Sequence, residues 1–522
     1  MNGLPALPVH VRQLDPFDFL ERSAAVYPEK VAVIDGSARR TYPQFLERVR
    51  RLAAALQARG IVRGERVAVL SPNATLPLEA TFAVPLAGAV LCALNTRLAP
   101  AEIDYILGHC GAALLLYDPE LQPLVERLTA RVPTISAYEA FLAAADPAKL
   151  VRRPGAEDDT ISINYTSGTT GRPKGVMYTF RGAYVNALAE VFHAGLRPDS
   201  VYLWTLPMFH CNGWCFPWAV TAAGATHVCL RRVEAPRIIE AIENDGVTHF
   251  CAAPTVLVGI ANHPGVQPFR RRIIATTAGA PPSPTTIAQM EALGAQINHV
   301  YGLTETYGPI TECAWRSPDW DAAGDAERAR LKSRQGVPMI TVGSGDVRVV
   351  DADLHDVPAD AVTPGEIVMR GNNVMKGYYA DPDATERAFA GGWFHSGDVA
   401  VRHPDGYLEI VDRAKDVIVS GGENISTVQV EKVLIAHDAV LECAVVAVPD
   451  ERWGEVAKAF VTLKPGRSAN PEELRAFVRE RLAGFKVPKY VEFGDLPKTS
   501  TGKIQKFVLR EREWAGREKR VQ

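Results

Sequence analysis

The sequence predicts an α/β fold: a large N-terminal domain of mixed or parallel sheets flanked by helices, a small antiparallel barrel, and a small α+β C-terminal domain. Three observations predict it. The 522 residues are too many for one hydrophobic core, so at least two domains are expected. Strand-like and helix-like segments alternate early in the chain, which is typical of a largely parallel sheet covered by helices. Short strand-like runs separated by turns follow between Val347 and Met369, which favours a small antiparallel barrel or sheet.

The first elements can be located individually. Val31–Ile34 is an apolar run typical of a strand. Thr41 and Gln44 form a capping box at the start of a helix that Gly60 ends. Arg66–Leu70 returns as a strand. Further buried strands are expected at Leu114–Tyr117 and Val228–Leu230.

Composition excludes several classes of protein. A net charge of −3 gives no electrostatic case for binding nucleic acid or an anionic membrane. Eight scattered cysteines favour reduced thiols over a disulfide framework. The apolar stretch from Ala80 to Thr96 is shorter than the roughly 20 residues that span a bilayer, and it contains Pro85 and Gly88. We expect a buried helix followed by a buried strand there, and no membrane span.

The two ends of the sequence carry no visible targeting signal. Met1–Pro5 lacks the basic and apolar regions of a secretory signal peptide. Lys519–Gln522 is not a peroxisomal address. A cytoplasmic protein is therefore expected, and a homodimer is compatible with the sequence.

The stretch Tyr165–Gly175 has the composition of a phosphate-binding loop. It concentrates hydroxyls, glycines and Lys174 between two strand-like runs. Glycines let backbone N–H groups converge on an anion, and hydroxyls and a lysine add donors. The loop is not a nucleoside-triphosphatase P-loop, because Pro173 replaces the second glycine and Gly175 follows the lysine. The alternative is a flexible turn between two strands.

The stretch Pro207–Trp214 groups His210 with Cys211, and Cys215 follows it. Zinc sites usually need a second pair of cysteines or histidines, and no such pair is evident, so we do not expect a metal here. A lone histidine beside aromatic residues is usually packed in a core.

The run Tyr301–Thr306 combines three side chains suited to a nucleotide. A tyrosine can stack on a purine, a threonine can donate to a phosphate, and a glutamate can supply oxygen to Mg²⁺. A surface loop with a chance acidic residue is the alternative. Ala278–Pro281, after an apolar run, is by itself only a turn at the end of a strand.

Three further positions carry charge near glycines in the last third of the chain. Asp398 follows Gly397 and can accept two hydrogen bonds from ribose hydroxyls. Arg413 follows a strand-like run. Lys503 lies in a Gly- and Thr-rich turn near the end of the chain, where a lysine is usually only solvated.

These motifs, in this order, closely resemble those of the adenylate-forming superfamily, which contains acyl-CoA synthetases, adenylation domains and beetle-type luciferases. The resemblance covers roughly Phe17 to Arg510 and includes the family's Y-G-x-T-E and P-K-T-x-x-G-K signatures. It implies an N-terminal AMP-binding domain at 1–412, a hinge at 413–416 and a mobile C-terminal domain at 417–522. Lys415 occupies the family's hinge position.

The resemblance also implies roles for individual residues. Tyr301 lies against adenine, Thr304 touches the α-phosphate, Asp398 and Arg413 hold the ribose, and Glu305 is the metal ligand. Thr304, Glu305 and Lys503 are the expected catalytic residues. The implied ATP- and AMP-binding residues are Thr166, Ser167, Gly168, Thr169, Thr170, Gly171, Lys174, Gly279, Ala280, Pro281, Tyr301, Gly302, Asp398 and Arg413. The implied acyl-pocket residues are His210, Asn212, Trp214, Phe216 and Gly302, and the implied CoA-binding residues are Gly421, Gly422 and Trp453. A hairpin turn is the alternative for the two glycines, and an ordinary interface tryptophan is the alternative for Trp453.

The implied activity is that of a carboxylate–CoA ligase with ATP, Mg²⁺ and CoA as cofactor and co-substrates. A carboxylate attacks the α-phosphorus of ATP, giving acyl-AMP and pyrophosphate, and the acyl group then passes to CoA. A stand-alone adenylation enzyme with an amine or a carrier-protein thiol as acceptor is the alternative. A luciferase-like monooxygenase would require oxygen, and a non-catalytic binding protein would be expected to lack Lys503, Glu305 or the phosphate loop.

The sequence predicts the identity of the carboxylic acid substrate less precisely. Acetate-specific relatives place a tryptophan in the Tyr-Gly-Leu-Thr-Glu region, where this chain has Gly302. We therefore expect room for more than two carbons, with Trp214 and Phe216 limiting the far end. Medium-chain fatty acids or aryl acids are favoured.

Overall fold

Two large β-sheets form the N-terminal part of the molecule in a computed structural model of the chain, which describes residues 9–153, 155–166, 173–279, 282, 284–413, 416–420, 423–450, 452–499 and 502–515. The first sheet is mostly parallel, and its strands are, in spatial order, β15 (Val337–Pro338), β14 (Gly308–Glu312), β13 (Ala295–Leu303), β12 (Ile273–Thr277), β11 (His249–Ala252), β9 (Val201–Leu203), β10 (Thr226–Cys229), β1 (Val31–Asp35) and β2 (Ala38–Thr41). The strands of the second sheet are β18 (Gly377–Tyr378), β8 (Lys174–Thr179), β7 (Thr160–Thr166), β4 (Val90–Leu94), β3 (Arg66–Leu70), β5 (Ala112–Tyr117) and β6 (Thr134–Ile135).

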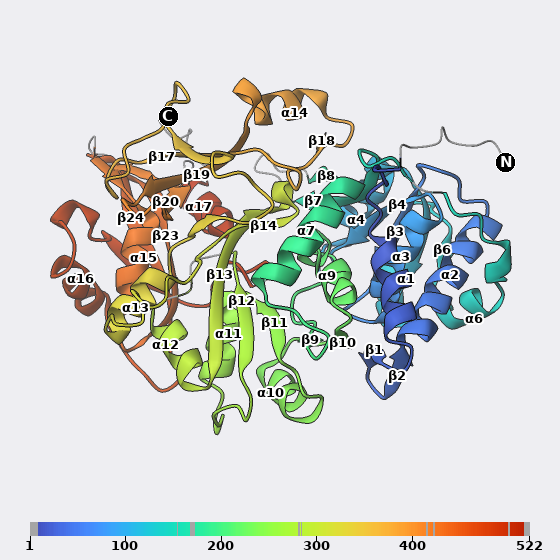
Figure 1. Ribbon diagram of the computed structural model, residues 1–522. Helices are drawn as coiled ribbons and strands as arrows, with labels where there is room; N and C mark the ends of the chain where they lie inside the picture. The colour runs from blue at the N-terminus through green and yellow to red at the C-terminus, as the bar shows by residue number, and fades with distance from the viewer. Residues whose placement is uncertain are drawn as a thin grey trace.

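Helices cover both faces of these sheets (Figure 1). One apolar core joins the facing sides of the two sheets to helices α1 (Phe17–Val26), α2 (Tyr42–Ala58), α3 (Thr75–Leu86), α7 (Phe180–His193) and α9 (Phe216–Ala222). The outer face of the first sheet packs on α10 (Ala235–Asn244), α11 (Pro254–Ala261) and α12 (Pro284–Ala292). The outer face of the second sheet packs on α4 (Pro100–Cys110) and α5 (Gln122–Val125). The sheets are therefore sandwiched between helical layers.

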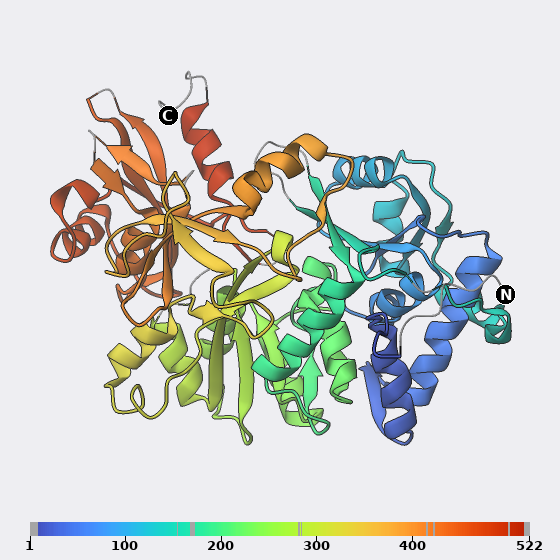
Figure 2. The same ribbon diagram turned by 45° about the horizontal axis from the view of Figure 1, so that its top comes forward.

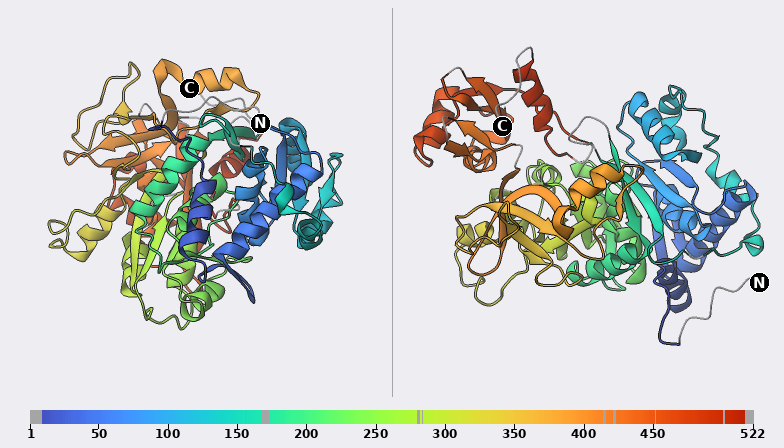
Figure 3. Two further views of the ribbon diagram at one scale, coloured as in Figure 1. Left: turned by 45° about the vertical axis from the view of Figure 1, so that its right-hand side comes forward. Right: turned by 90° about the horizontal axis from the view of Figure 1, so that it is seen from above.

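Two smaller sheets complete the chain. An antiparallel sheet of β16 (Val347–Val350), β17 (Gly365–Met369), β19 (Phe394–Arg402) and β20 (Leu408–Arg413) lies between the large sheets and the C-terminal elements (Figure 2). The C-terminal sheet contains β22 (Glu423–Ile425), β21 (Ile418–Ser420), β24 (Gly454–Leu463), β23 (Val440–Asp450) and β25 (Tyr490–Phe493). It packs on α15 (Thr427–Ile435) and α16 (Pro471–Arg479) around an apolar core of its own, and α17 (Lys506–Trp514) covers its other face. These elements gather at one end of the molecule (Figure 3).

The remaining short elements lie in the connections. The helices are α6 (Tyr138–Ala143), α8 (Cys211–Trp214), α13 (Asp325–Lys332) and α14 (Pro382–Ala388). The 3-10 turns are η1 (Pro119–Leu121), η2 (Pro147–Lys149), η3 (Thr304–Thr306), η4 (Ala390–Gly392) and η5 (Gly484–Lys486).

The structure confirms the predicted α/β architecture and the elements located from the sequence. Thr41 and Gln44 cap α2 as a capping box, with the Thr41 N–H donating to Gln44 Oε1 at 2.8 Å. The stretch predicted to be a buried helix and strand is α3 followed by β4. No helix in the described residues has the length and apolar character needed to cross a membrane. All eight cysteines are free thiols, and seven are buried.

A set of polar contacts ties α15 to the last strand before the predicted hinge. The Thr427 N–H donates to Asp412 Oδ2 at 2.6 Å, and the Ser426 hydroxyl donates to the Val411 carbonyl. Lys432 Nζ lies 2.7 Å from Glu409 Oε1. The C-terminal elements are thus held against β20 by hydrogen bonds and an ion pair.

Candidate active site

The candidate residues follow the carboxyl ends of strands, which is where ligands bind in open α/β sheets. Thr166 ends β7, His210 follows β9, Gly279 follows β12, and Thr304 follows β13. Gly279 is exposed and has a φ of +90°, a backbone conformation that glycine adopts without strain. Ala280 and Pro281 lie outside the described residues.

Three predicted nucleotide-binding side chains meet at one carboxylate. The Tyr301 hydroxyl donates to Asp398 Oδ2 at 2.8 Å, and Arg413 Nε lies 2.9 Å from Asp398 Oδ1. The Asp398 side chain is only 3% exposed. Each carboxylate oxygen keeps a second lone pair, so Asp398 can still accept hydrogen bonds from ribose hydroxyls. Residues from β13, β19 and β20 therefore build one polar site.

The two ends of the predicted phosphate loop are adjacent strand positions. Thr166 and Lys174 are paired across the antiparallel strands β7 and β8. Lys174 Nζ lies 4.6 Å from the centre of the Tyr378 ring. Ser167, Gly168, Thr169, Thr170 and Gly171 lie outside the described residues.

Thr304 and Glu305 are held by tyrosines from the second sheet. The Tyr378 hydroxyl donates to Glu305 Oε1 at 2.9 Å, and the Tyr178 hydroxyl donates to the Thr304 carbonyl at 2.7 Å. Burial raises the pKa of Glu305, although the Tyr378 hydrogen bond and the charges of Arg413 and Lys174 act in the opposite direction. A desolvated carboxyl is a hard oxygen donor that suits Mg²⁺, and a divalent cation would keep it ionised.

Lys503 reaches this site from the C-terminal elements. A Cβ atom on the neighbouring Gly502 would overlap Thr255 Oγ1 of α11, so this turn packs closely on the large domain. The pKa of His210 is lowered to about 4, first by burial and then by the positive charge of Lys503. The structure therefore brings Lys503 near His210 in the orientation that it describes.

The segment after His210 is wound in the left-handed direction. All five residues from Cys211 to Cys215 have φ between 43° and 63°. Each non-glycine residue in this conformation costs roughly 1–2 kcal/mol, and Asn and Gly are the types that tolerate it best. Gly213 is required for a second reason, since a Cβ there would lie 2.9 Å from the Trp204 ring. Such stored strain is typical of functional sites.

The predicted acyl-pocket residues on this segment are buried. Trp214 is 7% exposed and lies against Gly308, whose added Cβ would be 3.0 Å from Trp214 Cβ. Phe216 stacks on Tyr202 with ring centres 4.8 Å apart. Asn212 Nδ2 donates to Thr81 Oγ1 at 3.4 Å. The wall is therefore aromatic and closely packed.

Backbone packing explains why position 302 is a glycine, whereas the sequence predicted that this glycine makes room for the acid. A Cβ at Gly302 would overlap the Gly308 carbonyl oxygen and lie 2.7 Å from its carbon. The glycine is required by the close approach of β14, so it does not by itself indicate a long acyl pocket. The expectation of room for more than two carbons loses this support.

The predicted CoA residue that the structure describes, Trp453, lies in a turn of the C-terminal sheet. Trp453 is 45% exposed in the turn between β23 and β24, and Arg452 lies over its ring. Ser420, which precedes the predicted glycine pair, is paired with Gly454. Gly421, Gly422 and the hinge residue Lys415 lie outside the described residues.

Sequence reasoning missed three tyrosines that organise the site. Tyr178 and Tyr307 stack with ring centres 3.8 Å apart, and Tyr378 binds Glu305. Tyr307 follows the predicted motif Tyr301–Thr306, and Tyr178 lies shortly after the predicted motif Tyr165–Gly175. These positions could have indicated that the two tyrosines belong to the site. Tyr378 lies in a two-residue strand far along the chain, and nothing in its local sequence marks it.

Comparisons with known proteins agree with this geometry. The family model described as AMP-binding enzyme matches residues 20–379, and the model described as AMP-binding enzyme C-terminal domain matches residues 429–503. A peroxisomal acetate/butyrate–CoA ligase from Arabidopsis thaliana is 45% identical over 550 residues, covering 98% of this chain and 96% of the relative. A 4-hydroxybutyrate–CoA ligase from Metallosphaera sedula is 45% identical over 520 residues, covering 95% of this chain and 94% of the relative.

A solved structure shares the fold. ATP-bound MatB from Rhodopseudomonas palustris superposes with a TM-score of 0.85 at 27% identity, covering 96% of this chain and 99% of that one. The matched family models, the relatives and the ordered motifs lead to one conclusion. The chain belongs to the AMP-binding enzyme family, within the adenylate-forming superfamily that includes the acyl-CoA synthetases.

Proposed function

We propose that this protein is an ATP-dependent carboxylate–CoA ligase that prefers short acids. The observation that supports the proposal is the approach of Lys503 to His210, whose neighbour Cys211 has its Sγ atom 3.5 Å from Thr304 Oγ1, because this brings a positive charge to the side of the site where an acyl-adenylate would form. The names of the two relatives support the same reaction class.

The first half-reaction needs little proton chemistry, since the attacking carboxylate is already ionised. The carboxylate attacks the α-phosphorus of ATP, the bond to the β-phosphate oxygen breaks, and pyrophosphate leaves. In our proposal Asp398 and Arg413 fix the ribose, Lys174 and the phosphate loop hold the leaving phosphates, and Lys503 neutralises charge on the carboxylate and the α-phosphate. Charge stabilisation of this kind is usually the largest contribution to such reactions.

We propose Glu305 and the Thr304 hydroxyl as the groups that would hold Mg²⁺. The bound ion would neutralise charge on the phosphate oxygens. The residues of this chain then have the task of orienting the two substrates and excluding water. Tyr378 and Tyr178 contribute by fixing Glu305 and Thr304.

The second half-reaction needs a different arrangement of the small domain. In our proposal residues 417–522 rotate about the hinge at 413–416, centred on Lys415, relative to residues 1–412. Lys503 would leave the site, and the residues proposed to bind CoA, Gly421, Gly422 and Trp453, would arrive. The CoA thiolate then attacks the acyl carbonyl, and AMP leaves with the bond electrons.

A short acid is favoured by the packing of the wall. Trp214 and Phe216 are buried, Trp214 lies against β14, and Gly302 no longer argues for a long pocket. The relatives named above are ligases of acetate or butyrate and of 4-hydroxybutyrate. The preference for medium-chain or aryl acids stays a prediction that neither observation supports.

A panel of acids tests the proposal. Pyrophosphate release and CoA consumption are measured with acetate, propionate, butyrate, hexanoate, decanoate and benzoate. We expect acyl-CoA from two to six carbons and little from decanoate. Pyrophosphate release without CoA consumption would favour the amine or carrier-protein acceptor instead, and no release with any acid would overturn the proposal.

The location and assembly of the protein are proposed separately. We propose a cytoplasmic enzyme, although the Arabidopsis relative is named as peroxisomal. Fractionation of the source cells tests this. A homodimer stays a prediction, which sedimentation or light scattering tests.

A further inference from the structure

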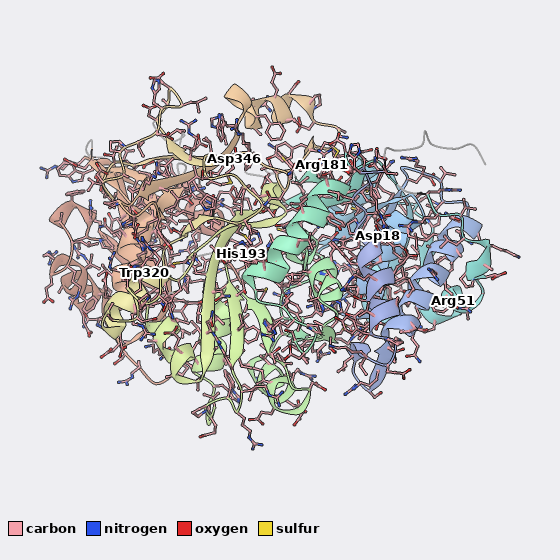
Figure 4. The ribbon with its side chains drawn as sticks, in the orientation of Figure 1. Asp18, Arg51, Arg181, His193, Trp320 and Asp346 are labelled. Carbon is pink, nitrogen blue, oxygen red and sulfur yellow. The ribbon has the colours of Figure 1, made fainter. Side chains whose placement is uncertain are left out.

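One buried carboxyl group in the large domain takes no part in the reaction described above. Glu190 lies on the inner face of α7 and is only 2% exposed. Its Oε1 atom has no hydrogen-bond partner among the described residues. Figure 4 labels His193, less than one turn further along α7, where His193 Nδ1 lies 2.6 Å from Glu312 Oε1. Within the described parts of the chain, no cation pairs with Glu190 in this way.

Glu190 lies close to the left-handed segment Cys211–Cys215, which carries the predicted acyl-pocket residues Asn212 and Trp214. Asn186, one helical turn before it, donates from Nδ2 to the Tyr307 carbonyl at 3.0 Å. The Cys215 thiol, at the end of the left-handed segment, approaches the same carbonyl at 4.0 Å. The Glu190 carboxyl is also close enough to influence the pKa of Cys215 and of Tyr202, on which Phe216 stacks. Two of the groups near Glu190 thus adjoin the predicted pocket residues: Cys215 lies between Trp214 and Phe216 in the chain, and Tyr202 stacks on Phe216.

A second unpartnered polar atom lies one turn away. Asn186 is fully buried, and its Oδ1 atom has no hydrogen-bond partner among the described residues. Leaving a buried polar group without a partner costs about 1–3 kcal/mol, so two such groups on one helix face need a reason. The neighbouring core positions on α7, Ala183 and Ala187, are small.

The surroundings of Glu190 favour its uncharged form. Burial raises its pKa well above the ordinary value, and the nearby negative charge of Glu312 raises it further. A protonated carboxyl can both donate and accept a hydrogen bond. A hydroxyl group has the same two capacities, whereas an alkyl end has neither.

We propose that Glu190, assisted by Asn186, ends the acyl pocket and binds the terminal hydroxyl of a short ω-hydroxy acid. The inference rests on the proposed ligase function and specifies its substrate class. The hydroxyl would donate to one oxygen of Glu190 or to Asn186 Oδ1 and accept from the carboxyl O–H. An unsubstituted acid of the same length would leave both groups buried and unpaired. Sites built to bind a substrate hydroxyl can reject the analogue that lacks it by several orders of magnitude.

Matched pairs of acids test the inference. The specificity constant for acyl-CoA formation is measured for 4-hydroxybutyrate against butyrate, 5-hydroxypentanoate against pentanoate, and 6-hydroxyhexanoate against hexanoate. We expect the wild type to prefer the hydroxy acid at least about tenfold at one of these lengths. Glu190→Leu should abolish that preference, and Glu190→Gln should keep part of it because an amide still donates and accepts.

Two controls separate recognition from damage to the fold. Acetate is too short to reach Glu190, so Glu190→Leu should retain acetate ligation within about threefold. Leu188→Ala changes an exposed side chain on the same helix and should leave every ratio unchanged. Equal use of each pair by the wild type, or an unchanged ratio in Glu190→Leu, would overturn the inference and leave the ligase function intact. If the wild type ligates no acid to CoA, the proposed function fails and the inference fails with it.

Discussion

In the proposed reaction, the Lys503 side chain serves only one of the two half-reactions. Lys503 belongs to the C-terminal elements, but its positive charge lowers the pKa of His210, which follows β9 in the first large sheet. The neighbouring Gly502 packs closely on Thr255 of α11. The charge is useful where negative charge concentrates on phosphorus and has no comparable role when a thiolate attacks a carbonyl. The two half-reactions should therefore differ in their dependence on this residue.

We expect Lys503→Ala to slow acyl-AMP formation at least about 100-fold, because a preorganised electrostatic group is lost. Thioester formation from synthetic acyl-AMP and CoA should stay near the wild-type rate. Single-turnover measurements of the two steps check this. Lys464→Ala, on the same domain, is the control, and an equal loss of both steps in Lys503→Ala would contradict the role.

Glu305 should show opposite effects on activity and stability. Its folded-state pKa is raised by burial, so its contribution to stability is complete below the unfolded pKa and is lost as the pH rises through the folded value. At neutral pH, above the unfolded pKa, the raised pKa of the carboxyl therefore lowers the stability of the empty protein. Glu305→Gln should therefore raise the temperature of thermal unfolding at pH 7 and lower the rate of adenylation by about 100-fold or more. The exposed Glu386→Gln variant is the control, and an unchanged rate with unchanged Mg²⁺ dependence would refute the metal role.

At the scale of elements, the contact of β13 with β14 determines which residue can follow Tyr301. A Cβ at Gly302 would meet only backbone atoms of Gly308 and Pro309, which cannot rotate away. Gly302→Ala should destabilise the protein by about 1–3 kcal/mol through overpacking. Urea unfolding followed by tryptophan fluorescence measures this. Gly345→Ala is the control, because the added carbon would have open space around it and Gly345 has no left-handed φ. It should leave stability nearly unchanged. Equal stability of the two variants would mean that the backbone of β14 can shift to make room for the Cβ atom at position 302.

Elements with strong local signals were predictable from the sequence. The capping box of α2 and the apolar runs of β1, β3 and β5 specify their own structure, because propensity and burial agree at these positions. The left-handed turn at Cys211–Cys215 was not predicted. Its Asn212-Gly213 pair permits such a turn, but packing against Trp204 and Gly308 selects it, and both partners are distant in sequence.

The residues of the candidate site also fall into those that the sequence identified and those that it did not. Motifs identified Tyr301, Glu305, Asp398 and Lys503, since each lies in a short run of chemically distinctive residues. Tyr378 was not identifiable, because its partner Glu305 is 73 residues away in the chain. Glu190 was missed for a related reason, since a glutamate on an amphipathic helix is usually solvated.

For the whole molecule, the relevant contact is that between α15 and β20, which polar groups join. His403 Nε2 lies 3.0 Å from Glu409 Oε2, and Lys432 lies on the other oxygen. The His403 hydrogen bond and the Lys432 charge lower the pKa of Glu409 to about 2, although burial acts in the opposite direction. A lowered folded pKa adds stability above the unfolded value of about 4.3, and this stability is lost as the pH falls towards 2.

We expect Glu409→Gln to lose up to about 3 kcal/mol of stability at pH 6, and the difference from the wild type to shrink steadily below pH 4. Thermal unfolding of both proteins at pH 6, 4 and 3 checks this. Because the pair joins the two domains, the variant should also slow adenylation more than thioester formation. A stability difference that is constant from pH 6 to pH 3 would show that the pair contributes nothing.

The proximity of Lys503 to His210 makes the imidazole a natural reporter of the catalytic cycle. Part of the depression of the His210 pKa comes from the lysine, so the imidazole should become more basic whenever the small domain swings away. The proton resonance of one ring could thus be titrated by NMR spectroscopy to read out the domain position without any attached label. Substrates that hold the lysine in place and products that release it would shift this resonance in opposite directions.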